Sequence, residues 1–252
     1  EVVVNVSIDD IGGKHDEIRG VKGNFDRALA SFVELRNLSK RYDNLTLGIH
    51  TVISRFNAPR FREIRDFILE KFAPDSYVAE IAENRAELLT MDKDISPEKA
   101  DFDAAASILI EASDPAAFRG AGRTAAAFRK SYYGFVKEYL ENPRQVIPCY
   151  AGTASAHIAP NGDVWMCCIK AEPVANLKEL NYNFKAAWKS EKALAERTHI
   201  KRGECACPLA NAYYTDMLMD FRTLFKVSVA AAGAFLRRKN DPADGEDYVG
   251  HK

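Results

Sequence analysis

No cysteine precedes Cys149 in this chain of 252 residues, and all five cysteines fall between Cys149 and Cys207. A secreted protein stabilised by disulfides usually spreads its cysteines along the chain and pairs all of them. The odd number and the clustering argue against a disulfide framework and indicate metal ligation in a reducing compartment. The opening residues, EVVVNVSIDD, also lack the basic stretch and cleavage site of a signal peptide, so we expect a cytoplasmic location.

An excess of either charge is missing too, because 35 Lys and Arg residues nearly balance 36 Asp and Glu residues. This balance means that no overall field argues for binding to nucleic acid or to an acidic membrane surface. The apolar run 224–236, followed by Arg237-Arg238-Lys239, is shorter than the about 20 residues that span a bilayer, so we expect no transmembrane segment. The run predicts a C-terminal helix that packs on the rest of the protein or lies in a membrane interface. From Asn240 onward we expect a flexible tail.

Strands and helices alternate through the first part of the chain. The β-branched and apolar residues predict strands over 2–8, 45–53 and 76–82. Helical spacing predicts a helix over 25–41, with Asn24 as its N-cap, and a second helix after Pro59. We expect a loop over 9–23. This order favours parallel βαβ units, whose active site lies at the carboxyl ends of the strands. Asp9 and the 54–58 loop directly follow two of these strands, so we expect them at the active-site edge of the sheet.

The second part of the chain has a different order of predicted elements. Two helices are predicted near 98–113 and 116–141, and the connector 143–148 suggests a boundary. We therefore divide the chain into a first domain over 1–145, a cysteine-rich domain over 146–226, and a helix end with a tail over 227–252. The turn signal Pro160-Asn161-Gly162-Asp163 predicts a β-hairpin with strands over 153–159 and 163–169. Helices are expected near 183–196 and from about 209.

Four of the cysteines form a ligand-like pattern: Cys149, Cys167, Cys205 and Cys207. The hairpin would bring the first two together, and the third and fourth would close the site from a loop. Thiolates bind zinc or iron–sulfur clusters. Zinc sites usually use Cys-x2-4-Cys pairs, which this pattern does not contain, so an iron–sulfur cluster is favoured. Cys168 would point to the opposite face of its strand, although it could replace Cys167 as a ligand.

Two histidines lie near these cysteines in the sequence and could belong to the same site. His157 lies on the predicted hairpin, where a ligand role is conceivable, but four cysteines suffice and a core or supporting position is favoured. His199 is expected on a solvated helix, within the basic run 197–202.

Two segments of the chain resemble the radical SAM enzymes that carry a SPASM or twitch auxiliary domain. The first is Val6-Ser7-Ile8-Asp9 with His15-Asp16-Glu17-Ile18-Arg19-Gly20 and Gly23-Asn24-Phe25, which is similar to the family's run on the fourth barrel strand and its helix. His50-Thr51-Val52-Ile53 with Asn57 resembles the fifth strand. The second segment, Cys149 to Cys207, resembles the auxiliary domain, with Asn176-Leu177 and Trp188 at the places of its G-N-L and W positions.

The resemblance implies an α/β fold: the C-terminal half of a partial (β/α)6 barrel plus a small auxiliary domain. It implies one auxiliary 4Fe-4S cluster, S-adenosylmethionine as cosubstrate, and hydrogen abstraction by a 5′-deoxyadenosyl radical. By matching position, Ser7 and Arg19 would contact the ribose or carboxylate end of S-adenosylmethionine, and Asn57 the adenine end. Asp9 is a candidate on the substrate side or a cap of its loop. The substrate would be a peptide or small molecule, and the electron donor a flavodoxin or ferredoxin.

The chain also departs from the family. It contains no C-x3-C-x2-C loop for the second 4Fe-4S cluster, Asp10 stands where the family has Gly, and the last cysteine pair is C-x-C. Since the chain opens directly on a core strand, we expect a fragment whose cluster loop lies upstream and which is inactive alone. Two other interpretations stay open: a zinc-stabilised, non-enzymatic binding module, and a membrane-peripheral enzyme that modifies glycoconjugates and uses the 224–239 helix.

Overall fold

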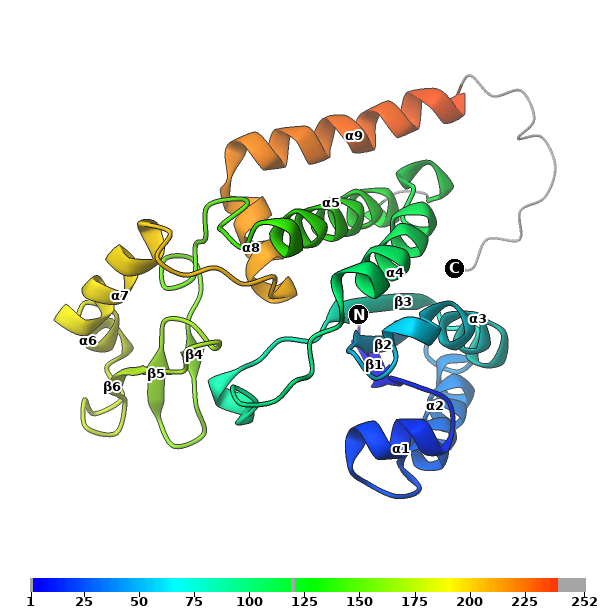
Figure 1. The fold of residues 1–252 in the computed structure, drawn as a ribbon, viewed down its shortest axis with the longest axis horizontal. Helices are drawn as coiled ribbons and strands as arrows, with labels where there is room; N and C mark the ends of the chain where they lie inside the picture. The colour runs from blue at the N-terminus through cyan, green and yellow to red at the C-terminus, as the bar shows by residue number, and fades with distance from the viewer. Residues whose placement is uncertain (1, 119–120, 240–252) are drawn as a thin grey trace. The chain divides into compact units, whose positions relative to one another are not determined.

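A computed structural model of the chain describes residues 2–118 and 121–239 (Figure 1). The chain divides into two compact units. The first contains residues 2–82 and 95–108, and the second contains residues 83–94 and 109–239, apart from the undescribed pair. The division lies elsewhere than the predicted boundary at 145/146, since residues 109–145 join the cysteine-rich region. The helix α4 (Lys99–Ala112) runs through this division.

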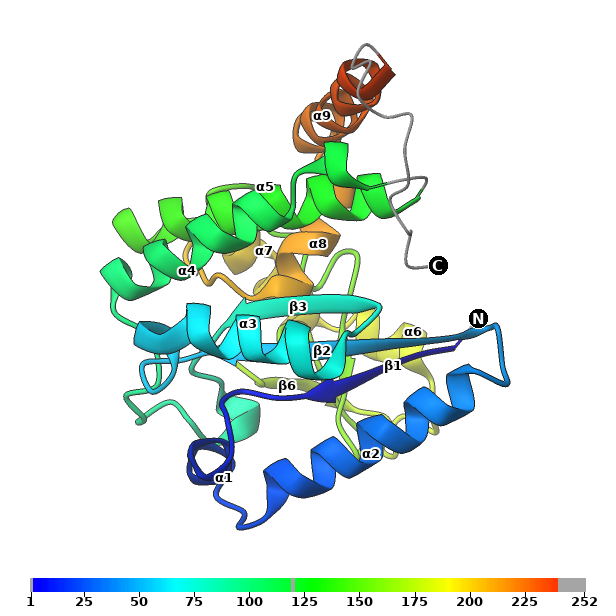
Figure 2. The same cartoon turned by 90° about the vertical axis from the view of Figure 1, so that its right-hand side faces the viewer.

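The first unit is built on a parallel three-stranded sheet in the order β1-β2-β3, formed by β1 (Val2–Ser7), β2 (Leu45–Ile53) and β3 (Ser76–Ile81). All three strands were expected, and the middle one has the predicted bounds. The helices α2 (Asn24–Ser39) and α3 (Phe61–Phe72) pack on the sheet, and Figure 2 shows α2 along one face of the strands. Their shared core joins Ile8, Leu47 and Ile49 to Phe32 and Ile68.

The segment after β1 is more ordered than the expected loop over 9–23, because α1 (Gly13–Arg19) lies within it. Glycines with positive φ, Gly12 and Gly20, precede and end this short helix, and such glycines make helical boundaries hard to read from apolar spacing. The predicted N-cap role of Asn24 is wrong. Gly23 occupies that position, and the Asn24 side chain instead bonds the fully buried ring of His15.

Buried polar side chains join the carboxyl ends of β1 and β2. The Asn57 side chain, which has no exposed surface, donates from Nδ2 to the carbonyl oxygens of Asp9 (2.7 Å) and Val52 (2.8 Å). Its Oδ1 accepts a hydrogen bond from the Ser54 amide (2.7 Å). Asp9 in turn accepts a hydrogen bond from the Val52 amide (2.9 Å). The side-chain amide of Asn57 and the carboxylate of Asp9 therefore hold the ends of β1 and β2 together. The short 3₁₀ turn η1 (Ala58–Arg60) follows.

The second unit combines helices with a small antiparallel sheet. Its long helix is α5 (Ala121–Glu141), preceded by the 3₁₀ turns η2 (Ala86–Leu88) and η3 (Pro115–Ala117). The sheet contains β4 (His157–Ile158), β5 (Asp163–Trp165) and β6 (Pro173–Asn176) in that order. The predicted hairpin is therefore present with much shorter strands, and sequence reasoning missed β6. Gly162, with φ of 97°, forms the predicted turn, which disfavours any residue with a side chain.

Four helices complete the second unit: α6 (Phe184–Trp188), α7 (Glu191–Lys201), α8 (Ala210–Met219) and α9 (Phe221–Lys239). The single helix predicted over 183–196 is wrong, because Ser190 caps a new helix by accepting a hydrogen bond from the Ala193 amide. The helix predicted from about 209 is likewise interrupted at Asp220, which caps α9 through Thr223. The tail predicted from Asn240 lies outside the described residues. No helix within residues 2–118 and 121–239 is both long and apolar enough to cross a membrane.

The interaction between Asn57 and the strand ends gives a first prediction. Asn57→Ala leaves one amide and two carbonyl groups in the buried strand ends without this partner, so we expect a loss of about 2–4 kcal/mol in unfolding free energy. Urea unfolding followed by circular dichroism measures it. The matched control is Asn37→Ala on the exposed side of α2, which should change stability by less than about 0.5 kcal/mol. Equal stability of the two variants would show that Asn57 does not hold the strand ends.

Candidate metal centre

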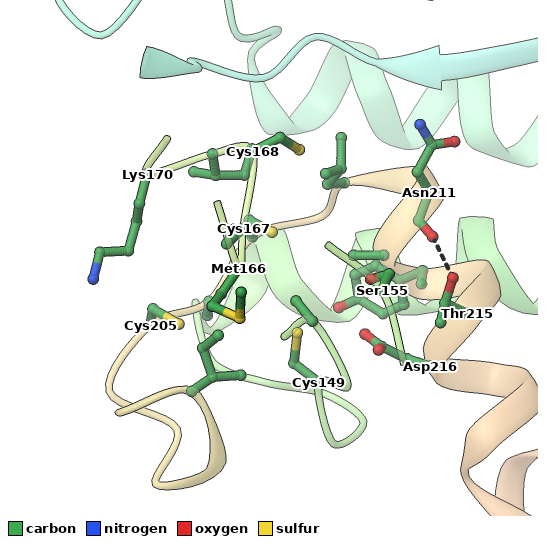
Figure 3. Close-up of a pocket in the computed structure, with 18 of the residues that line it drawn as sticks. Cys149, Ser155, Met166, Cys167, Cys168, Lys170, Cys205, Asn211, Thr215 and Asp216 are labelled. Atoms are coloured by element: carbon green, nitrogen blue, oxygen red, sulfur yellow. Dashed lines mark hydrogen bonds between the residues drawn. The ribbon is translucent and has the colours of Figure 1, made fainter. Parts of the chain in front are cut away.

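Three segments of the second unit bring the predicted cysteine ligands to one cavity of about 180 Å³. Cys149 follows the connector after α5, Cys167 lies just after β5, and Cys205 and Cys207 lie between α7 and α8. All four line the cavity, and Figure 3 shows Cys149, Cys167 and Cys205 around it. All the cysteines are free thiols, and these four are partly buried. The chain therefore gathers the four predicted side chains although they are far apart in sequence.

A small apolar core lies beneath the thiols. Val164 and Met166 from the sheet pack with Ala193 and Ile200 from α7, and Cys149, Cys167 and Cys205 rest against this core. The apolar surroundings limit the access of water to the sulfurs. Such a setting lowers the local dielectric and shapes the potential of a bound metal group.

Gln145 connects two of the cysteine segments. Its Nε2 donates to the carbonyl oxygens of Cys205 (3.1 Å) and Ile200 (2.8 Å), and its Oε1 accepts a hydrogen bond from the Cys149 amide (3.4 Å). One side chain thus holds the first cysteine segment beside the third. This residue also lines the cavity.

Asp216 holds the Cys149 segment from the other side. Its carboxylate, 4% exposed on α8, accepts a hydrogen bond from the Tyr150 amide at 2.6 Å. Burial raises the pKa of Asp216 to about 7, although the hydrogen bonds from Tyr150 and the Cys149 thiol oppose this increase. The loop beyond is fixed by Arg197, whose Nε donates to the Gly152 carbonyl oxygen. The Arg197 guanidinium also stacks at 4.3 Å over the Trp188 ring.

Burial favours the protonated form of three of the four thiols, those of Cys149, Cys205 and Cys207. Burial raises the pKa of Cys149 to about 12, and the nearby charges of Asp216, Cys167 and Cys205 add to the effect. Burial likewise raises the pKa of Cys205 and of Cys207, the latter with a contribution from Glu83. Each thiol must release its proton to bind a metal, so metal binding strengthens as pH rises.

Zinc and a four-iron cluster make different demands on a set of four thiolates. Within the described ranges, no group of three or more His, Cys, Asp or Glu side chains is arranged to hold one metal ion. Four thiolates around one zinc would each lie about 2.3 Å from it. In a four-iron cluster each thiolate binds a different corner, so the sulfurs stand farther apart. The four thiols that line the cavity are a donor set that either group can use.

A comparison with protein families identifies this same region. Residues 149–208 match SPASM, the iron–sulfur cluster-binding domain. The match begins at Cys149 and includes all five cysteines, and it supports an iron–sulfur cofactor. No curated protein and no solved structure matches the chain.

Within the SPASM match, Cys168 lines the same cavity as its neighbour Cys167 but is more deeply buried. The sequence placed it in a strand, but β5 ends at Trp165 and Cys168 lies in the following turn. Figure 3 shows its sulfur pointing away from those of Cys149 and Cys205. Burial raises its pKa to about 11, with contributions from Glu87 and Cys167. Both cysteines line the cavity, and the choice of Cys167 as the ligand stays a prediction.

The other predicted residues near the SPASM match differ in their placement. His157 lies on β4, where it is exposed and lines the cavity, so of the two positions expected for it the core position is wrong and the supporting position stays a prediction. His199 lies on α7, partly exposed as expected, and its Nδ1 is 2.7 Å from a Glu204 carboxylate oxygen. Asn176 bonds Asp163 across the sheet, and Leu177 belongs to the apolar core beneath the cysteines.

The residues proposed to contact S-adenosylmethionine lie in the first unit, at the carboxyl end of its sheet. Ser7 is the last residue of β1, in register with His50. Arg19 donates from Nε to Asp9 at 2.6 Å, and all polar atoms of the Asn57 side chain bind backbone groups. Asp9 is 3% exposed and held by Arg19 and the Val52 amide. Asp10, which replaces the family's Gly, is fully buried and pairs with Arg60 at 3.1 Å.

Sequence reasoning missed Gln145 and Asp216, the two residues that hold the Cys149 segment. Gln145 lies in a connector without periodicity, so no pattern marks it. Asp216 had a usable signal, because it is the one acidic residue in the stretch Ala210–Met219, whose other residues are apolar or uncharged. A lone carboxylate on such a helix often has a buried partner.

The bridging position of Gln145 gives the second prediction. Gln145→Ala removes three hydrogen bonds between the Cys149 and Cys205 segments, and partners of metal ligands commonly change metal affinity by roughly 10- to 100-fold. We expect a loss of iron to a chelator that is faster by about that factor, measured anaerobically after reconstitution. Asn142→Ala, in the exposed start of the same connector, is the matched control and should lose iron at the wild-type rate. Equal rates in both variants would contradict the role of Gln145.

Proposed function

We propose that this chain is part of a radical SAM oxidoreductase or maturase, and that residues 149–208 hold its one auxiliary 4Fe-4S cluster. The observation that carries the proposal is the convergence of four free thiols on one apolar-floored cavity within the region that matches SPASM. The parallel sheet that precedes this region is consistent with the later strands of a partial (β/α)6 barrel.

The donor set suits the cluster. Cys149, Cys167, Cys205 and Cys207 would each supply one thiolate, and Cys168 would stay outside the ligand set. Gln145 keeps the first and third segments together, and Asp216 fixes the backbone at Tyr150. The cluster would bind substrate or transfer electrons, which a flavodoxin or ferredoxin would supply. A reducing compartment such as the cytoplasm would keep the thiols available.

In the first unit, the residues at the carboxyl ends of β1 and β2 would serve S-adenosylmethionine, from which the catalytic 4Fe-4S cluster of such enzymes generates the hydrogen-abstracting 5′-deoxyadenosyl radical. Ser7 and Arg19 would bind the ribose or carboxylate end. The Asn57 amide is occupied by backbone groups, so its contribution would be to hold the 54–57 turn at the adenine end. Asp9 orients the Arg19 guanidinium on the side of a peptide or small-molecule substrate.

Metal analysis of single-cysteine variants tests the cluster and supplies the third prediction. Anaerobic reconstitution should load about four iron and four sulfide per chain. Cys149→Ser, Cys167→Ser, Cys205→Ser and Cys207→Ser should each lower the iron content and the cluster absorption, whereas Cys168→Ser, the matched control, should load normally. One zinc per chain without iron or sulfide would support the alternative of a zinc-stabilised binding module. If Cys168→Ser loses iron and Cys167→Ser does not, Cys168 is the ligand in place of Cys167.

Reductive cleavage of S-adenosylmethionine tests the radical chemistry and is the fourth prediction. Protein expressed from the intact gene, loaded with iron and sulfide and reduced with dithionite, should form 5′-deoxyadenosine. Arg19→Ala should lower this rate roughly tenfold, because it removes a charged contact to the cosubstrate. Arg27→Ala, on the exposed face of α2, is the matched control. If protein fully loaded with iron and sulfide forms no 5′-deoxyadenosine, the proposed radical SAM reaction is contradicted, although the iron–sulfur site is not.

A further inference from the structure

The helix α9 presents large apolar side chains to solvent. Phe221 is 86% exposed, Phe225 is 70% exposed and Val229 is 53% exposed. These residues are spaced four apart, so they lie along one side of the helix, which we call the α9 apolar face. Leu218 and Met219, at the end of α8 beside it, are also about half exposed. Exposed apolar groups gathered in this way mark an interaction site more often than scattered ones do.

The opposite side of α9 packs against other elements of the second unit. Thr223 and Val227 are buried, and α9 contacts α5, α8 and η3 of the same unit. Figures 1 and 2 both show α9 lying beside α5. The orientation of the helix is therefore fixed from within the unit. The α9 apolar face cannot turn inward without breaking these contacts.

Basic residues accompany the α9 apolar face. Arg222 and Lys226 are exposed and follow Phe221 and Phe225 by one position, which puts them on the adjoining side of the helix. The sequence of α9 contains no Asp or Glu, and its remaining basic residues are Arg237, Arg238 and Lys239. The chain as a whole has balanced charge, with 35 basic and 36 acidic residues. The charged residues of the helix that exposes the phenylalanines are thus all basic, and the carboxylate of Asp220, which caps the start of the helix, interacts with Arg222 and Lys226.

We propose that the α9 apolar face docks on an anionic membrane surface. A bilayer supplies both things this face lacks, an apolar layer for the phenylalanines and anionic headgroups for Arg222 and Lys226. A second copy of the chain would satisfy the apolar groups but would bring basic residues against basic residues. The helix lies flat in the interface, consistent with the absence of a described helix that could cross a membrane.

Vesicle flotation of the iron-loaded protein tests the proposal. The protein should float with phosphatidylcholine vesicles that contain about one quarter phosphatidylglycerol and stay behind with pure phosphatidylcholine, because the basic residues need anionic lipid. Phe221→Ser with Phe225→Ser should abolish flotation, and Arg222→Gln with Lys226→Gln should weaken it roughly tenfold or more. The matched control is Phe56→Ser, which removes an exposed phenylalanine from the first unit. Circular dichroism and iron content establish that every variant is folded.

A fluorescence measurement locates the contact. Tryptophan emission of Phe225→Trp should shift to the blue on addition of the anionic vesicles, whereas that of Phe56→Trp should not move. The proposal is overturned if the wild-type protein does not float, or if the Phe221/Phe225 variant floats like the wild type. It is also overturned if the wild-type protein forms a dimer that this variant dissolves while neither binds vesicles, since the face would then be an interface between two copies.

Discussion

Gln145 is where the cysteine-bearing segments of this protein meet. Its amide binds the backbone on both sides of the cavity, at Cys149 and at Cys205, so the two loops are positioned before any metal arrives. The sulfurs of a cluster must stand at fixed corners, and loops alone rarely hold side chains that accurately. The apolar core around Val164 and the Asp216 contact to Tyr150 complete the support. These contacts of the second unit therefore hold the cysteine-bearing segments around the cavity.

The sequence was informative where a pattern is strong. The strand over 45–53 is rich in β-branched and apolar residues, and the turn at Gly162 requires a backbone conformation that favours glycine, so both could be predicted. The four thiols could be grouped because their spacing and the hairpin between them point to one site. The match of residues 149–208 to an iron–sulfur cluster-binding domain supports that interpretation.

The rest depended on contacts that no local pattern encodes. The helix α1 was missed because it is short, polar and bounded by glycines. The break at Ser190 was missed because a single capping hydroxyl outweighs continuous helical spacing. Gln145 and Asp216 act through partners far away in the chain, at Cys205 and Tyr150 respectively. The ends of β1 and β2 show the same limit, since Asn57 works through three backbone groups that only the folded sheet brings within reach.

The raised pKa values of Cys149 and Cys207 have a consequence for the chain before it receives iron. Thiol oxidation and disulfide exchange proceed through the thiolate, which these buried groups scarcely form at neutral pH. Burial of Cys149 and Cys207 therefore slows their oxidation and cross-linking before a metal group binds. The same burial makes metal binding proton-releasing, because each thiol must lose its proton to become a ligand. Slow oxidation and proton release on metal binding therefore share one cause, the burial of the thiols.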